Sequence, residues 1–182
     1  MRSLISAMAL LALSCGFALA DQDDPRLDPL FDELRTAEDP EAAFRAERSI
    51  WSIWLQHDDQ QVEEMMAVGT TAMNLGNLED ALAVFDKMIE VEPDYAEAWN
   101  KRATVHYALG DYEASLADIE ETLDREPRHF GALSGRGLCY AAQDKLEEAI
   151  RAFEAALDLH PHSRGAQTSI DLLREALEGR SI

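Results

Sequence analysis

Apolar side chains recur every three or four positions along residues 62–163, in a pair of segments that occurs three times. A spacing of three to four residues is typical of an amphipathic α-helix. The recurring face of the first segment is Met65, Val68 and Ala72, then Trp99, Ala103 and His106, then Leu133, Gly137 and Tyr140. That of the second segment is Ala81, Phe85 and Met88, then Ser115, Ile119 and Thr122, then Ala149, Phe153 and Ala156. The pattern therefore predicts three pairs of helices.

Three prolines mark the period of this pattern. Pro93, Pro127 and Pro161 follow one another at intervals of 34 residues. A fixed period of this length indicates a chain built from structural repeats. The predicted units are 62–95, 96–129 and 130–163.

Turn signals separate the two helices of each unit. Gly76 and Gly110 can take the left-handed conformation that ends one helix, and the Asn or Asp that follows can cap the next. The third unit has Asp144 in place of glycine, so we expect a tighter and less favourable turn there. Small residues at matching places on the two helices, such as Gly69 with Ala81 and Gly137 with Ala149, predict that the helices of a unit approach closely.

With these residues in place, the sequence resembles the tetratricopeptide repeat family over residues 62–163. The resemblance implies an all-α solenoid of three helical hairpins that binds other proteins. Met65, His106, Ser115 and Asp144 depart from the family pattern, which leaves the fold expectation intact but not its fine geometry. The matching residues are Gly69, Ala81, Phe85, Trp99, Gly137, Tyr140, Ala149, Phe153, Ala156 and the three prolines.

Helical patterns also flank the repeats. Residues 164–182 predict one more helix, which caps the apolar face of the last repeat. Within residues 21–61, an acidic tip is followed by two apolar stripes that predict a helical hairpin capping the other end. Trp51 and Trp54 cannot both face one core together with Ile50 and Ile53 unless the apolar face is wide. Either both tryptophans therefore lie at the core rim or one contacts a partner.

The first twenty residues have the pattern of a secretory signal peptide. Arg2 precedes an apolar run from Leu4 to Leu13, and small residues at Ala18 and Ala20 predict cleavage after Ala20. The run is too short for a transmembrane helix, and no second one follows, so we expect no integral membrane segment. A lipoprotein, acylated at Cys15, is the alternative, although Ala12 stands where that motif prefers Leu. The leader favours a bacterial exported protein, hence the periplasm.

Charge restricts the partners. The 182 residues carry 36 acidic and 16 basic side chains, a net charge of −20. Nucleic acid and anionic lipid surfaces bind through clustered cations, so both are disfavoured. After cleavage of the leader Cys139 is the remaining thiol, and the chain holds no N-glycosylation motif.

The sequence contains none of the common catalytic signatures, such as a P-loop, GxSxG, HExxH or CxxC motif. Cys139 is interpreted as a small buried residue rather than a nucleophile, because no His stands at a local helical spacing to activate it. His129, His160 and His162 lie at corners that are too far apart to share a metal ion. We therefore expect no enzymatic activity, no cofactor and no metal.

Two adjacent cations in this acidic chain, Lys101 and Arg102, raise the question of a ligand. Arg102 holds the seventh place of its unit, opposite Asp118 on the second helix, where the first unit has Val68 and Val84. An ion pair between helices therefore explains Arg102 better than a ligand does. Arg136, at the same place in the third unit, is expected to pair with Glu154 or with a neighbouring unit.

The resemblance implies a concave surface formed by the first helices, with Lys101 at its edge. It combines thioethers, hydrogen-bonding groups and small apolar groups, which suits a helix or an extended peptide with an apolar stripe. The cations that hold a C-terminal carboxylate in some family members are largely missing. The predicted partner-binding residues are Met66, Thr70, Met73, Asn100, Lys101, Thr104, Tyr107, Ser134 and Leu138.

Together these features predict a non-catalytic protein-interaction adaptor of the bacterial envelope. Two alternatives remain open at this point. One is a lipid-anchored envelope assembly factor, which requires acylation of Cys15. The other is a self-associating scaffold, because the open ends of a solenoid can stack.

Overall fold

The structure, a computed structural model, describes residues 21–180. The predicted signal peptide, with Cys15, lies outside the described residues. Within them a short 3₁₀ turn precedes helices only, which confirms the all-α prediction. The helices are α1 (Leu27–Thr36), α2 (Pro40–Trp54), α3 (Gln60–Asn74), α4 (Leu78–Val91), α5 (Ala96–Leu109), α6 (Tyr112–Arg125), α7 (Phe130–Ala142), α8 (Leu146–Leu159) and α9 (Arg164–Arg180).

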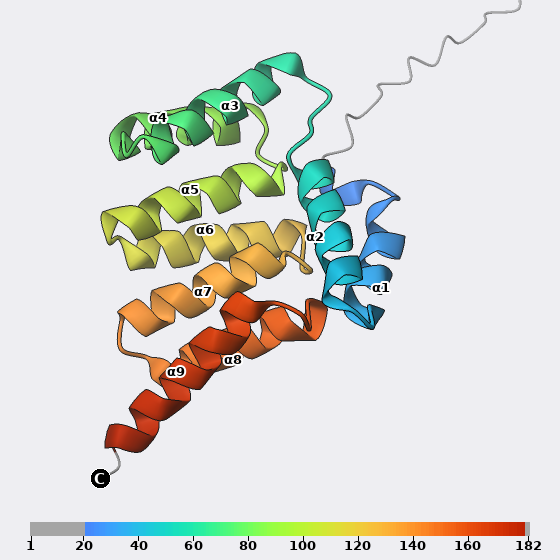
Figure 1. The fold of residues 1–182 in the computed structure, drawn as a ribbon. Coiled ribbons are helices and arrows are strands. Elements are labelled where there is room, and N and C mark those ends of the chain that lie inside the picture. The colour runs from blue at the N-terminus through green and yellow to red at the C-terminus, as the bar shows by residue number, and fades with distance from the viewer. Residues whose placement is uncertain (1–20, 181–182) are drawn as a thin grey trace, which may run out of the picture.

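The three predicted helix pairs are the antiparallel hairpins α3–α4, α5–α6 and α7–α8, which stack side by side (Figure 1). Gly76 and Gly110 have φ angles of 78° and 81° at the turns of the first two hairpins. Asp144 takes φ 62° at the third turn. Asp is one of the few residues other than Gly that tolerates this left-handed region. The same turn therefore forms in all three repeats.

Close contact between the two helices of a hairpin depends on glycine, which has no Cβ atom. A Cβ atom added at Gly69 would lie 2.7 Å from the ring of Phe85, and one added at Gly137 would lie 2.8 Å from the ring of Phe153. These distances are shorter than any ordinary carbon contact. Glycine at these places therefore lets an aromatic ring of the second helix pack directly against the backbone of the first.

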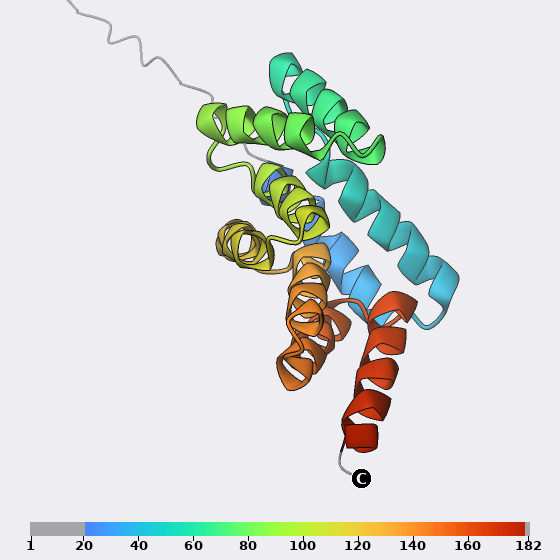
Figure 2. The same ribbon diagram turned by 90° about the vertical axis from the view of Figure 1, so that its left-hand side faces the viewer.

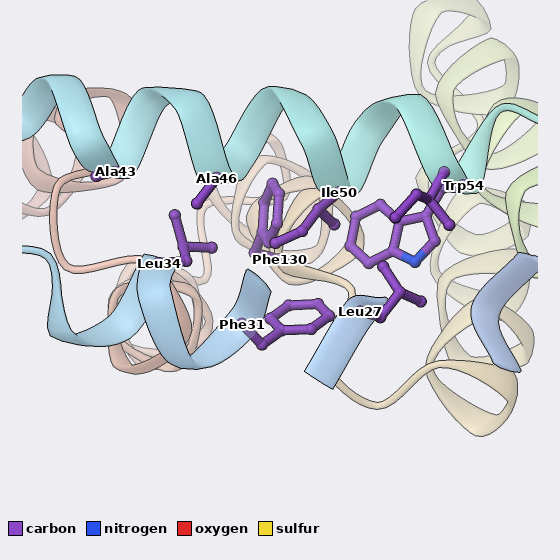
Figure 3. Packing of buried hydrophobic residues seen from close by; sticks show 9 residues of the cluster. Leu27, Phe31, Leu34, Ala43, Ala46, Ile50, Trp54 and Phe130 are labelled. Atoms are coloured by element: carbon purple, nitrogen blue, oxygen red, sulfur yellow. The ribbon is translucent and has the colours of Figure 1, made fainter. Parts of the chain in front are cut away.

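The N-terminal hairpin of α1 and α2 forms, but it does not cover the outer face of α3 and α4. It lies beside the stack, along the ends where one repeat connects to the next (Figures 1 and 2). Its apolar residues enclose Phe130, the first residue of α7, as Figure 3 shows. The buried members of this cluster are Leu27, Phe31, Leu34, Ala43, Ala46, Ile50, Ile53, Trp54 and Phe130.

Polar contacts fix this hairpin to three corners of the stack, which are the loops that follow α4, α6 and α8. The hydroxyl of Tyr95 donates to the carbonyl oxygen of Trp54 at 2.8 Å, at the first corner. Arg128, at the second, lies 2.7 Å from Asp28 and over the ring of Phe31. His162 Nε2, at the third, lies 2.9 Å from the carbonyl oxygen of Ala37. The hairpin therefore connects all three repeats along one edge rather than capping one end.

Ion pairs connect the second helix of each repeat to the element that follows. Arg102 donates from Nε and Nη2 to Asp118 at 2.8 and 2.7 Å, which confirms the predicted pair, and also from Nη1 to Asp86 of the preceding repeat at 2.8 Å. The bonds to Asp118 raise the pKa of Arg102. Arg136 pairs with Glu120 of the preceding repeat, at 3.1 Å, and not with Glu154. Glu154 pairs instead with Arg174 of α9.

The last helix, α9, packs on the third repeat. Its residues Ala166 and Ile170 are buried against Ala149 and Phe153. This arrangement agrees with the predicted C-terminal cap. Together, the repeats, the edge hairpin and α9 leave the concave side of α5 and α7 accessible.

We expect that replacing Arg102 by Met lowers the free energy of unfolding by about 3 kcal/mol, because it leaves the buried Asp118 carboxylate without its cation. The double variant Arg102→Val/Asp118→Val, which copies the Val68 and Val84 pair of the first repeat, should lie within about 1 kcal/mol of wild type. Urea unfolding followed by circular dichroism measures both. A double variant as unstable as the single one contradicts this account.

Candidate functional site

A small hollow lies on the concave side between α5 and α7. Its volume is about 70 Å³, and α6 contributes Ser115 and Ile119 to its lining. Two of the predicted partner-binding residues, Thr104 and Leu138, are exposed there. No lining residue is charged. The lining comprises Asn100, Ala103, Thr104, Tyr107, Ser115, Ile119, Gly131, Gly135 and Leu138.

The hollow unites four of the nine predicted residues, namely Asn100, Thr104, Tyr107 and Leu138. The other five lie outside it. In the first repeat Met66 is buried, while Thr70 and Met73 are half-buried. Ser134 is half-buried and donates to the carbonyl oxygen of Phe130 at 2.9 Å, and Lys101 is held in an ion pair. The structure therefore concentrates the predicted surface between the second and third repeats.

The ion pair of Lys101 belongs to a buried network that the sequence pattern does not predict. Glu97 is about 1% exposed, and its carboxylate lies 2.9 Å from Lys101 Nζ. The Asn100 amide donates to it at 3.0 Å, and His129 Nε2 lies at 2.9 Å. Burial acts to raise the pKa of Glu97, but Lys101 and His129 outweigh that effect and hold it below its usual value.

His129 joins this network to the N-terminal hairpin. Its Nδ1 accepts a hydrogen bond from the backbone N–H of Ala132 at 3.0 Å, so the ring proton is on Nε2, which donates to Glu97. Its ring stacks on the indole of Trp54, with centroids 4.2 Å apart and planes inclined by 9°. His129 therefore contacts both α2 and the buried carboxylate of α5.

Trp51 lies against Gly131, one of the lining residues of the hollow. It is half-buried, whereas Trp54 is fully enclosed in the core. A Cβ atom added at Gly131, which lines the hollow, would lie 2.8 Å from the Trp51 ring, so only glycine leaves room for it. Lys101 Nζ lies 5.7 Å from the centroid of the same ring. Of the two tryptophans, Trp54 is buried and Trp51 is partly accessible to solvent.

A second, larger cleft of about 510 Å³ lies between α2 and α9, lined in part by Phe44, Glu47 and Arg164. His160, also in its lining, is buried with Nε2 3.4 Å from Glu47. Burial lowers the pKa of His160 below its usual value. Among residues 21–180, no three His, Cys, Asp or Glu side chains are grouped closely enough to hold a metal ion.

Cys139 lies beneath the hollow and is fully buried. Its Sγ donates to Ser115 Oγ at 3.2 Å, and that hydroxyl donates to the carbonyl oxygen of Ala103 at 2.8 Å. Burial raises the pKa of the thiol, which keeps it protonated and weakly nucleophilic. This environment is that of a packing residue.

None of the helices within residues 21–180 is long and apolar enough to cross a membrane.

Comparison with known sequences gives two matches to repeat proteins. The sequence profile of the tetratricopeptide repeat family matches residues 67–118 and 100–164. A TPR repeat-containing protein of Rhizobium etli is 36% identical over 82 residues. That alignment covers 45% of this chain and 40% of the Rhizobium protein, so it spans less than half of either.

Solved structures resemble this chain in fold. The second TPR domain of human RPAP3, in complex with an HSP70 peptide, has a TM-score of 0.59 at 23% identity, covering 63% of this chain and 95% of that domain. The TPR2B domain of yeast Sti1, in an Hsp70 complex, has a TM-score of 0.61 at 17% identity, covering 65% and 99%. The MamA protein has a TM-score of 0.61 at 23% identity, covering 86% and 83%. At these identities the likeness concerns the fold.

Two glycines of α7 provide a matched test of the hollow and its support. A Cβ atom at Gly135 would meet Ile119 at an ordinary 3.5 Å, so Gly135→Ala should raise the free energy of unfolding by about 0.5–1 kcal/mol. Gly137→Ala should lower it by about 1–3 kcal/mol because of the overlap with Phe153. Chemical denaturation measures both variants. Equal effects of the same sign contradict the geometry.

Proposed function

Because the chain belongs to the tetratricopeptide repeat family, we propose that it is a non-catalytic adaptor that binds a segment of another protein on its concave side. The observation that carries this proposal is the hollow between α5 and α7, where neutral hydrogen-bonding groups and apolar surface lie next to each other. The human and yeast domains described in complexes with Hsp70 segments support peptide binding as a class.

The chemistry of the hollow favours an uncharged occupant. Thr104 and Tyr107 offer hydroxyl groups on α5, where Asn100 is buried and bonded to Glu97, and Leu138 offers an exposed apolar side chain on α7. A short helix or extended segment with one apolar side chain directed at Leu138 can form apolar contacts with α7 and hydrogen bonds with α5. Basic residues flanking that segment are favoured by the net charge of −20.

An acidic tail is a poor fit for the same surface. Lys101 follows the lining residue Asn100 in the chain, and its charge is already neutralised by the buried Glu97. A carboxylate placed in the hollow loses its hydration without gaining an unpaired cation in return. This disfavours the binding of a C-terminal carboxylate, as the sequence analysis also expected.

The cellular setting is a further part of the proposal. The pattern of residues 1–20 supports export to the bacterial periplasm, with a soluble adaptor as the mature product. A lipid-anchored assembly factor is the alternative, and it differs in one covalent feature, the acylation of Cys15. No contact of residues 21–180 bears on this choice.

Mass spectrometry of the protein isolated from the cell distinguishes these routes. We expect a mature chain that begins at Asp21 with a free amino group. An acylated N-terminal Cys15 establishes the lipid-anchored alternative. A chain that still begins at Met1 contradicts export by either route.

A matched pair of leucine variants tests the binding site. Leu138 and Leu109 are exposed to similar extents, 42% and 46%, but only Leu138 lines the hollow. In crosslinking pull-downs from envelope extract, Leu138→Glu should lose the principal partner by about tenfold or more, because a charge in the hollow opposes apolar contact. Leu109→Glu should retain it. Equal recovery by both variants, at equal helicity, removes the hollow from the binding site.

A further inference from the structure

The outer face of the first repeat is apolar and open. α3 and α4 form one end of the stack, and no described helix lies beyond them (Figure 1). Met65, Val68 and Val84 line a depression of about 420 Å³ on this end face, with Glu64 and Lys87 at its rim. Val68 is 57% exposed. Terminal repeats usually need a polar outer face for solubility, so this apolar end is unusual.

The repeats themselves indicate what these positions do. The places equivalent to Val68 and Val84 hold Arg102 and Asp118 in the second repeat, where Arg102 also reaches back to Asp86 of the preceding repeat. The seventh place is therefore one that packs against a preceding element. In the first repeat no described element fills this role, because the N-terminal hairpin lies along the corners instead.

We propose that this end face binds the end face of a second copy of the chain, forming a dimer with two-fold symmetry. In such an interface the same patch is used by both copies, so it has to complement itself. The relevant axis runs parallel to α3 and α4, along the seam between them. This axis places α3 of one copy on α4 of the other.

The end face is self-complementary about that axis. α3 and α4 run antiparallel from the turn at Gly76, and Val68 and Val84 are equally far from Gly76 along the chain. The axis therefore brings Val68 of one copy onto Val84 of the second. Glu64 and Lys87 are equally far from Gly76 to within one residue, so opposite charges meet on both sides of the axis.

The distribution of charge supports a second copy over an unrelated partner. Lys87 is the only basic residue among residues 62–95, which carry eight acidic ones, and it lies on the rim of this face. Its present ion pair with Glu90, at 2.9 Å, joins two highly exposed side chains and is readily exchanged. Each copy thus offers one acid and one base at matching heights.

The size of the face sets the expected strength. Two helices of 15 and 14 residues provide an interface at the small end of the range for specific dimers. The net charge of −20 on each copy also opposes association, most strongly at low salt. We therefore expect a dimer that dissociates on the order of micromolar concentration. The hollow between α5 and α7 is not part of this face, so the dimer does not depend on the proposed binding function.

Sedimentation equilibrium of the purified full chain at physiological salt, over a dilution series from about 100 to 1 μM, tests the proposal. Wild type should pass from dimer to monomer within this range. Glu64→Lys and Lys87→Glu should each weaken association about tenfold or more, because each places like charges opposite each other. The double variant Glu64→Lys/Lys87→Glu should restore it, since residues 64 and 87 then carry opposite charges again where the two copies meet.

Two further variants complete the design. Val68→Arg, which places on this face the residue found at the seventh place of the later repeats, should abolish the dimer. Leu172→Arg adds the same charge at a 61% exposed leucine of α9 and should leave it unchanged. Circular dichroism confirms equal helicity. A wild-type monomer at 100 μM, a dimer lost through Leu172→Arg alone, or a double charge reversal that fails to restore association overturns the proposal.

Discussion

The stacking of His129 on Trp54 is the contact on which the arrangement of the molecule depends. On one side it fixes α2 against the corners of the repeats. On the other, the same imidazole donates to Glu97, which in turn holds Lys101 and Asn100. The hairpin and the buried carboxylate of α5 are therefore linked through one side chain. Because the hairpin is used along the edge, it is not available to cover the first repeat.

Buried carboxylates also explain the two adjacent cations of α5. Lys101 neutralises Glu97, and Arg102 neutralises Asp118 and extends to Asp86. Glu97 and Asp118 are nearly inaccessible to solvent, and removing the cation from either leaves a charge that the interior cannot solvate. Neither cation is therefore free to hold an anionic ligand. In a chain with a net charge of −20, the concave surface between α5 and α7 is neutral, because Lys101 and Arg102 pair with buried carboxylates.

This arrangement separates the surfaces of the molecule by chemistry. The concave hollow is small, neutral and partly polar, and Trp51 lies against Gly131 of its lining. The end face of α3 and α4 is broader and more apolar, with one charge of each sign. The first suits a short segment of another protein, and the second suits a copy of itself. Because they lie on different faces, one can be occupied without blocking the other.

The sequence alone determined the three hairpins, their turns and the pair of Arg102 with Asp118. These features recur with a fixed period, so the position of each residue in one unit predicts its neighbours in the next. Glu97, His129 and Trp54 come from different segments with no common spacing, and their association was not predictable. The apolar stripe of α2 is compatible with an end cap as well as with the corners. Only the tertiary structure decided between them, because the choice depends on which surface offers complementary shape and hydrogen bonds, and Phe130, His129 and Tyr95 provide these at the corners.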